Sequence, residues 1–307
     1  MKKPIVFAAL IVVLFLATGA FADSKGQPNC HARVSGYIDL NDTSLYYEMK
    51  GCGEPVVLVH GITLDARMWD RQFRFLSQHY KVIRYDTRGH GRSAGIIPFS
   101  PYWLHEDLRG LLDALGIESA HLVGLSMGGQ TVVDFAVTYA ERVRSLVHAD
   151  GSISGFGGWS PEFWTIWLAY FDAWESLPIE GALELWFKDP MFKYILATPG
   201  AGRHFEKIVS EHAKQGLGAC FSANWYFSMT VDDAIDRLDS ITVPTLVIVG
   251  EYDLPEFHTC AELLYDGVST PDHEKSMYVI PGSGHMSNME RPDYINNLLL
   301  EFLQDGD

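Results

Sequence analysis

Short apolar runs recur along the chain, and several of them end in a glycine-rich break. Runs without polar alternation are typical of strands buried on both faces of a parallel sheet. The predicted strands cover residues 36–40, 45–49, 56–59, 81–85, 121–123, 144–149, 245–249 and 277–280. Helical stretches lie between several of them, at 69–79, 101–115 and 130–140, and another closes the chain at 294–302. This alternation predicts an α/β fold with a mostly parallel, eight-stranded sheet flanked by helices.

The alternation stops in residues 151–235, which contain no run of the buried-strand type. We interpret this segment as a helical cap, inserted after the sixth strand between core segments 23–150 and 236–307. Its aromatic residues have two interpretations, packing within the cap and the lining of an apolar pocket. The segment holds six of the eight tryptophans, namely Trp159, Trp164, Trp167, Trp174, Trp186 and Trp225.

The N-terminus has the features of a signal peptide over residues 1–22. Lys2 and Lys3 precede an uncharged apolar run at 5–17, and Ala20-Phe21-Ala22 matches a small-x-small cleavage site. We expect cleavage before Asp23 and export to the periplasm or the exterior. An uncleaved membrane anchor is the alternative, because residues 5–22 are about long enough to span a bilayer. The short apolar core and the cleavage site favour removal.

Export would let the four cysteines form disulfides, and four cysteines allow three pairings. Cys30 and Cys52 flank the first predicted hairpin, so we favour that pair. Cys220 and Cys260 would then join the cap to the core. The alternative is free, buried thiols.

Composition narrows the class of partner. The 307-residue chain is 47% hydrophobic, enough for a sizeable core, and its formal net charge of −16 would become −18 without residues 1–22. Such acidity argues against nucleic acid or anionic lipid as a partner. No C-x-x-C motif or His/Cys cluster suggests zinc, and we expect no metal or cofactor.

The stretch at 120–140 carries the strongest chemical signal. A buried strand breaks at Gly124-Leu125-Ser126-Met127-Gly128, and a helix follows. Strand, tight turn and helix with serine at the apex is the context of a nucleophile elbow. The glycines allow a strained turn and close helix–strand packing. The motif alone is weak, since a chain of this length contains it by chance about one time in ten.

Two further strand ends supply the groups that a serine nucleophile needs. Asp253 follows the strand at 245–249, and His285 follows the strand at 277–280. Ends of parallel strands lie along one sheet edge, where histidine could take the proton of Ser126 and a carboxylate could orient the histidine. Alternatives remain, because His285 could be a surface histidine and Asp253 a helix cap, with Asp150 the rival acid. Chain order favours Asp253.

Five motifs together resemble the α/β-hydrolase superfamily over residues 36–304, and most closely its capped lactonases, esterases, carbon–carbon bond hydrolases and cofactor-free haloperoxidases. They are His60-Gly61, Asp86-x-Arg-Gly-His-Gly-x-Ser93, Gly124-x-Ser126-Met-Gly-Gly129, Gly250-x-x-Asp253 and Gly284-His285.

The resemblance implies Ser126 as nucleophile, His285 as base and Asp253 as acid, with an oxyanion hole from the backbone N–H groups of Ile62 and Met127. A serine at the apex argues against the dehalogenase and epoxide hydrolase members, whose nucleophile is a carboxylate.

The segment 86–93 also invites a phosphate-loop interpretation, but it lacks a suitably placed lysine and no helix follows at once. We therefore expect a structural turn in which Arg88 and His90 support the oxyanion loop, as the family resemblance implies.

We therefore expect a secreted serine hydrolase that cleaves carboxylic esters or lactones of hydrophobic small molecules. The mostly uncharged, aromatic cap favours such a substrate over a sugar or a phosphate ester. A perhydrolase, a haloperoxidase or a carbon–carbon bond hydrolase would use the same three residues. A ligand-binding protein that keeps the fold without turnover is the alternative from another class. We expect no nucleic acid partner and no stable membrane insertion after cleavage, and the oligomeric state is open.

Overall fold

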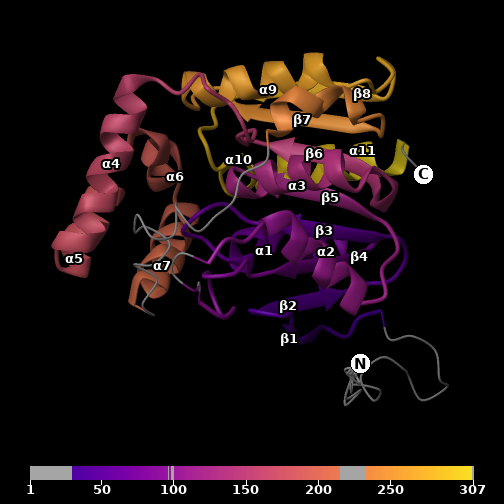
Figure 1. Cartoon of the computed structure of the whole chain (residues 1–307), viewed down its shortest axis with the longest axis horizontal. Helices are drawn as coiled ribbons and strands as arrows, with labels where there is room; N and C mark the ends of the chain where they lie inside the picture. The colour runs from indigo at the N-terminus through magenta and orange to yellow at the C-terminus, as the bar shows by residue number, and fades with distance from the viewer. Residues whose placement is uncertain (1–29, 96, 98–99, 215–232, 306–307) are drawn as a thin grey trace, which may run out of the picture.

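The computed structural model describes residues 30–95, 97, 100–214 and 233–305. The predicted signal peptide, Trp225 and Cys220 lie outside these residues. Eight strands form one sheet in the order β1-β2-β4-β3-β5-β6-β7-β8 (Figure 1). The strands are β1 (Val34–Asp39), β2 (Ser44–Lys50), β3 (Pro55–Val59), β4 (Lys81–Tyr85), β5 (Ala120–Leu125), β6 (Val143–Ala149), β7 (Thr245–Gly250) and β8 (Lys275–Ile280). Strand β2 pairs antiparallel with β1 and β4, and the other pairings are parallel, as the buried runs predicted.

Helices cover both faces of the sheet and divide the core into two apolar layers. On one face pack α1 (Asp70–Leu76) and α11 (Pro292–Asp305); on the other pack α2 (Leu104–Ala114), α3 (Met127–Thr138) and α9 (Pro255–Gly267). Successive side chains of a strand point to opposite faces. In β3, Val56 and Leu58 therefore join the α1 layer, whereas Val57 and Val59 join the α3 layer. This explains why its whole run is apolar.

Several short helical elements connect these larger ones. They are η1 (Ala66–Trp69) before α1, η2 (Ala140–Arg142) after α3, η5 (Ala234–Ser240) before β7 and α10 (Ser287–Glu290) before α11.

A helical insertion follows β6 and lies beside one end of the sheet (Figure 1). It comprises α4 (Pro161–Ser176), α5 (Ile179–Trp186), η3 (Pro190–Phe192), α6 (Lys193–Ala197) and α7 (Ala201–Lys214). Ser160 caps α4 by accepting a hydrogen bond from the backbone N–H of Phe163, and Pro161 occupies the first turn. Aromatic rings form the interior of the insertion. The centroid of the Phe192 ring lies 5.0 Å from that of Trp186 and 4.9 Å from that of Phe205.

The cysteines only partly match the predicted pairing. A disulfide joins Cys30 to Cys52 and ties the start of β1 to the turn after β2. The pairing of Cys220 with Cys260 was wrong, because Cys260 carries a free thiol. Cys260 is completely buried in the layer between α9 and the sheet, which raises its pKa to about 12.

None of the helices in the described part of the chain combines the length and apolar character needed to cross a membrane.

Candidate active site

A strained turn at the end of β5 presents Ser126. Its φ of 58° and ψ of −118° place this non-glycine residue in a left-handed conformation. The flanking glycines are required by contact distances. A Cβ atom on Gly124 would lie 2.1 Å from the carbonyl oxygen of Gly128, and one on Gly128 would lie 2.1 Å from that of Val59. At this turn β5, α3 and β3 therefore pack so closely that a side chain fits at neither glycine.

Two backbone N–H groups lie beside this serine. Met127 is the first residue of α3, so its N–H has no acceptor within the helix and sits at the positive end of the helix dipole. Ile62 follows β3 and lines the same cavity as Ser126 and Met127. Within the described residues, no protein acceptor binds either N–H. Both groups are thus available to an oxygen bound near Ser126.

Three side chains from three strand ends form one hydrogen-bonded chain. His285 Nε2 lies 3.0 Å from Ser126 Oγ, and His285 Nδ1 lies 2.9 Å from Asp253 Oδ2. All three residues are buried. The carboxylate can only accept from Nδ1–H, which leaves the Nε2 lone pair directed at the serine hydroxyl. The structure thus brings together the three residues that the sequence predicted at these strand ends.

Electrostatics at His285 favour its protonated form. Burial opposes the charge on the imidazolium, but the negative charge of Asp253 and its hydrogen bond outweigh that effect. Asp150 and Asp189 add to the attraction, and the net result is a raised pKa for His285. An imidazole with these neighbours can accept a proton from the serine and hold the resulting charge.

The rival acid, Asp150, is used differently. Its Oδ1 accepts a hydrogen bond from the backbone N–H of Gly250 at 2.7 Å, and its Oδ2 accepts from the hydroxyl and N–H of Ser287. Burial and the nearby charge of Asp253 raise the pKa of Asp150 well above its ordinary value. Asp150 therefore ties the end of β7 to the start of α10, and Asp253 and His285 lie in the loops next to these two ends.

Glu290 makes a second brace, which the sequence analysis missed. Its Oε2 accepts from the N–H of Gly284 at 2.7 Å and from the hydroxyl of Ser283 at 3.1 Å, and its Oε1 accepts from the N–H of Met286 at 3.3 Å. Burial raises its pKa. One buried carboxylate thus fixes the loop on both sides of His285. The only signal in the sequence is an acid five residues after that histidine.

The turn at 86–93 supports the loop after β3. Asp86 accepts hydrogen bonds from the backbone N–H groups of Ala66 and Arg92, each at 2.8 Å. His60 Nε2 accepts from the N–H of Thr87 at 2.9 Å.

Arg88 and His90 contact neighbouring side chains at the same turn. Arg88 pairs with Asp42 and Asp107, and the ring of His90 packs between those of His60 and His212. His90 thus contacts His60 at the start of the loop after β3, as expected, whereas the ion pairs of Arg88 are with Asp42 and Asp107 and not with that loop.

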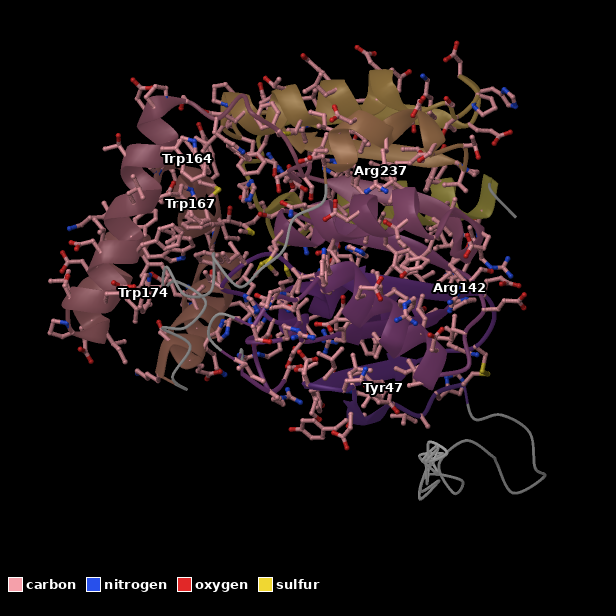
Figure 2. All side chains as sticks on the ribbon, in the orientation of Figure 1. Tyr47, Arg142, Trp164, Trp167, Trp174 and Arg237 are labelled. Atoms are coloured by element: carbon pink, nitrogen blue, oxygen red, sulfur yellow. A yellow bond between two sulfur atoms is a disulfide. The ribbon has the colours of Figure 1, made fainter. Side chains whose placement is uncertain are left out.

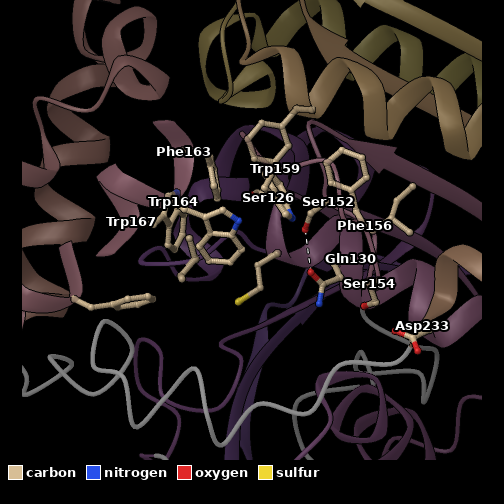
Figure 3. A pocket seen from close by; sticks show the side chains of 16 residues that line it. Ser126, Gln130, Ser152, Ser154, Phe156, Trp159, Phe163, Trp164, Trp167 and Asp233 are labelled. Atoms are coloured by element: carbon tan, nitrogen blue, oxygen red, sulfur yellow. Dashed lines mark hydrogen bonds between the residues drawn. The ribbon is translucent and has the colours of Figure 1, made fainter. Parts of the chain in front are cut away.

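A cavity of about 440 Å³ opens above Ser126. Aromatic rings form much of its wall, and Figure 3 shows Phe163, Trp164 and Trp167 on one side of the serine. The aromatic lining residues are Phe156, Trp159, Phe163, Trp164, Trp167, Phe171 and Phe257. Three of the six predicted cap tryptophans thus line the cavity, among them Trp164 and Trp167 of α4 (Figure 2), whereas Trp186 is buried in the insertion. Gln130, Ser152, Ser154 and Asp233 lie on the opposite side (Figure 3).

The sequence of residues 54–292 matches the family model for the alpha/beta hydrolase fold. The chain belongs to the α/β hydrolases.

Relatives of this α/β hydrolase include enzymes of more than one activity. 3-Oxoadipate enol-lactonase 1 of Acinetobacter baylyi is 28% identical, over 81% of this chain and 88% of its own. A 2-hydroxy-6-oxo-6-phenylhexa-2,4-dienoate hydrolase of Comamonas testosteroni is also 28% identical, over 92% of this chain and 98% of its own. The crystal structure of the enol-lactonase from Burkholderia xenovorans LB400 superposes with a TM-score of 0.72 at 27% identity, over 88% of this chain and all of that one. These likenesses support hydrolase activity, and they leave the bond that this hydrolase cleaves open.

Within the residues that the structure describes, this α/β hydrolase has no group of three or more His, Cys, Asp or Glu side chains placed to hold a metal ion.

Proposed function

We propose that this α/β hydrolase cleaves carboxylic esters or lactones of hydrophobic small molecules through an acyl-enzyme. Ser126 is the nucleophile, His285 the general base and Asp253 the acid that orients it. The observation that carries the proposal is the chain of contacts from Ser126 Oγ to His285 Nε2 at 3.0 Å and from His285 Nδ1 to Asp253 at 2.9 Å.

The geometry supports a two-step reaction. His285 Nε2 takes the hydroxyl proton as Ser126 Oγ attacks the carbonyl carbon, and it then gives that proton to the departing alkoxide. The N–H groups of Met127 and Ile62 stabilise the oxyanion of each tetrahedral intermediate. Loss of one such donor typically raises the barrier by about 3 kcal/mol. Water, deprotonated by His285, then hydrolyses the acyl-enzyme and restores Ser126.

The cavity supports a hydrophobic substrate of modest size. Its volume of about 440 Å³ and its aromatic wall suit a ring or a short chain. The enol-lactonase relative is named for 3-oxoadipate, a carboxylate. We infer a different substrate here, because the described residues that line this cavity include no lysine or arginine to pair with a carboxylate. Export, with residues 1–22 removed as a signal peptide, is part of the same proposal.

The test compares Ser126→Ala with wild type on 4-nitrophenyl butyrate. We expect kcat to fall at least several hundredfold, and a fluorophosphonate probe to label wild type but not the variant. Ser176→Ala is the matched control, because the hydroxyl of this serine near the end of α4 bonds a carbonyl oxygen of its own helix. This variant should keep the wild-type kcat and the labelling by the probe. An unchanged rate in Ser126→Ala would refute the proposal. Absence of labelling in folded wild type would favour a ligand-binding protein without turnover.

A carbon–carbon bond hydrolase with the same three residues is the second candidate. The Comamonas testosteroni relative, which is named for a phenylhexadienoate, aligns over 92% of the chain. Product analysis with a vinylogous ketone would separate it from an esterase. A perhydrolase or haloperoxidase would instead show a rate that depends on peroxide.

A further inference from the structure

The cavity above Ser126 has two chemically different ends. Phe163, Trp164 and Trp167 come from α4 and lie on one side of the serine, and Ser154 and Asp233 lie on the other (Figure 3). An ester bound with its carbonyl carbon at Ser126 Oγ would place one substituent against each end. The two ends therefore select the two halves of the substrate separately.

The end on α4 is a continuous aromatic surface. The rings of Trp159 and Phe163 stack with centroids 4.3 Å apart, and those of Phe163 and Trp167 stack at 5.4 Å. Stacked rings offer a flat, apolar wall with no charge to neutralise. This wall suits an aromatic or branched aliphatic group.

The opposite end carries a single charge. Among the described residues that line the cavity, Asp233 is the only charged side chain. It is solvent-exposed and forms no ion pair with another described residue. In the same cavity, Gln130 Oε1 accepts the hydroxyl hydrogen of Ser152 at 3.0 Å, which leaves the Gln130 amide hydrogens for a ligand. A group bound here meets a carboxylate, uncharged hydrogen-bonding side chains and the ring of Phe156, which Figure 3 shows on the same side of Ser126.

The sequence directly before Asp233 carries no cationic side chain. Residues 215–232 contain no Lys, Arg or His in the sequence. The whole chain, at −16, adds a field of the same sign as Asp233. A substrate carboxylate at this end would therefore be repelled without compensation, whereas an ammonium group would be attracted.

We propose that the hydrolase selects esters that carry a cationic amine at the Asp233 end and an apolar group against the α4 wall. This inference rests on the proposed esterase activity and adds the charge of the substrate. Because Asp233 is exposed, we expect a preference of roughly tenfold rather than an absolute requirement.

The experiment uses three 4-nitrophenyl esters that share a three-methylene acyl chain and differ in the group at its end. They are the cationic 4-(trimethylammonio)butanoate, its neutral isostere 5,5-dimethylhexanoate and the anionic hemiglutarate. For wild type we expect kcat/KM to fall in that order, with about a tenfold range between cation and anion that shrinks in high salt. Asp233→Asn should reduce the ratio of kcat/KM between the cationic and the anionic ester at least about threefold. Asp233→Lys should give the anionic ester the higher kcat/KM.

The matched control is Asp236→Asn, an equal charge change three residues away at an exposed position outside the cavity lining. Asp236→Asn should leave unchanged both the order of kcat/KM among the three esters and the ratio between the cationic and the anionic ester. The inference is overturned if the anionic ester matches the neutral one, or if Asp233→Asn and Asp236→Asn behave alike.

Calorimetry with Ser126→Ala and the same esters as uncleaved ligands tests charge selection without turnover. If wild type hydrolyses none of the esters, the esterase proposal fails. The order of the measured affinities then still tests charge selection, which requires the cationic ester to bind more tightly than the anionic one.

Discussion

His212, on α7 of the insertion, donates a hydrogen bond from Nδ1 to the carbonyl oxygen of Thr63 at 2.8 Å. Thr63 directly follows Ile62 and has a φ of 65°, a left-handed conformation that a β-branched residue rarely adopts. Both residues of the pair are buried. A helix of the insertion thus contacts the strained residue next to Ile62, whose backbone N–H we propose as an oxyanion donor.

His212→Ala should lower kcat by about tenfold and change KM little, because a loosened Ile62 N–H weakens binding of the oxyanion more than of the substrate. His204→Ala is the control, since His204 lies on the same helix and bonds the carbonyl oxygen of Arg67 instead. Steady-state kinetics and thermal melts of both variants separate the effects. Equal kcat in the two variants would contradict a role in positioning.

The two buried acids near His285 should respond differently to the same substitution. Asp253→Asn should lower kcat by about three to four orders of magnitude, because the amide favours the wrong tautomer of His285. Asp150→Asn should lower kcat far less but reduce the free energy of unfolding by about 1–3 kcal/mol, since its amide N–H₂ would face the N–H of Ser287. Kinetics combined with urea unfolding measure both. Similar kcat losses would make Asp150 an equal candidate for the acid.

Activity should rise with pH through the pKa of His285. In the proposed mechanism the imidazole of His285 accepts the Ser126 proton only when it is neutral. The Asp253 charge raises the pKa of His285 above the ordinary 6.5 despite burial. The acid limb of kcat/KM should therefore have its midpoint above 6.5, with activity lost below it. In Asp253→Asn, burial acts without the opposing charge, so the midpoint should move to lower pH. A midpoint that stays in place would assign the limb to another group.

The elbow glycines should not tolerate a methyl group. Gly124→Ala places Cβ 2.1 Å from the carbonyl oxygen of Gly128, a backbone atom that cannot move without shifting α3. We expect loss of soluble protein or a drop in unfolding free energy of more than about 3 kcal/mol. Gly95→Ala, where a Cβ meets nothing within 4 Å, is the control and should melt like wild type. A stable, active Gly124→Ala would contradict the close packing of β5 on α3.

The Cys30–Cys52 disulfide should stabilise the fold measurably. It closes a loop with a sequence separation of 22 residues, and in the chain-entropy model this corresponds to about 3 kcal/mol. Thermal melts with and without reductant should differ for wild type and coincide for Cys52→Ser. Cys260→Ala should keep the response to reductant, since its thiol is free. A wild type insensitive to reductant that demonstrably breaks the bond would refute the prediction.

The sheet could be predicted from local sequence patterns, because a strand that is buried on both faces requires a run of apolar residues. The run 246–249 is apolar throughout because both of its faces are covered, and the polar residues that follow the strand lie at the sheet edge. The positions of Ser126, Asp253 and His285 at three strand ends followed from the same pattern, together with their chain order.

Contacts between segments that are far apart in the sequence produce no such local pattern of residue types. Asp150 and Asp253 both follow buried strands, and only the packing of β7, β8 and α10 shows which carboxylate meets His285. The burial of Cys260 against the sheet likewise depends on which face of α9 turns inward.

The sequence alone therefore determined the fold, the elbow and the places of Ser126 and His285 at the sheet edge, because burial and chain reversal restrict residue types within a few positions. The tertiary structure decided the braces by Asp150 and Glu290, the contact of His212 with Thr63, and which tryptophans face Ser126. Those depend on side-chain direction and on docking between elements up to about 150 residues apart, such as His212 and Thr63.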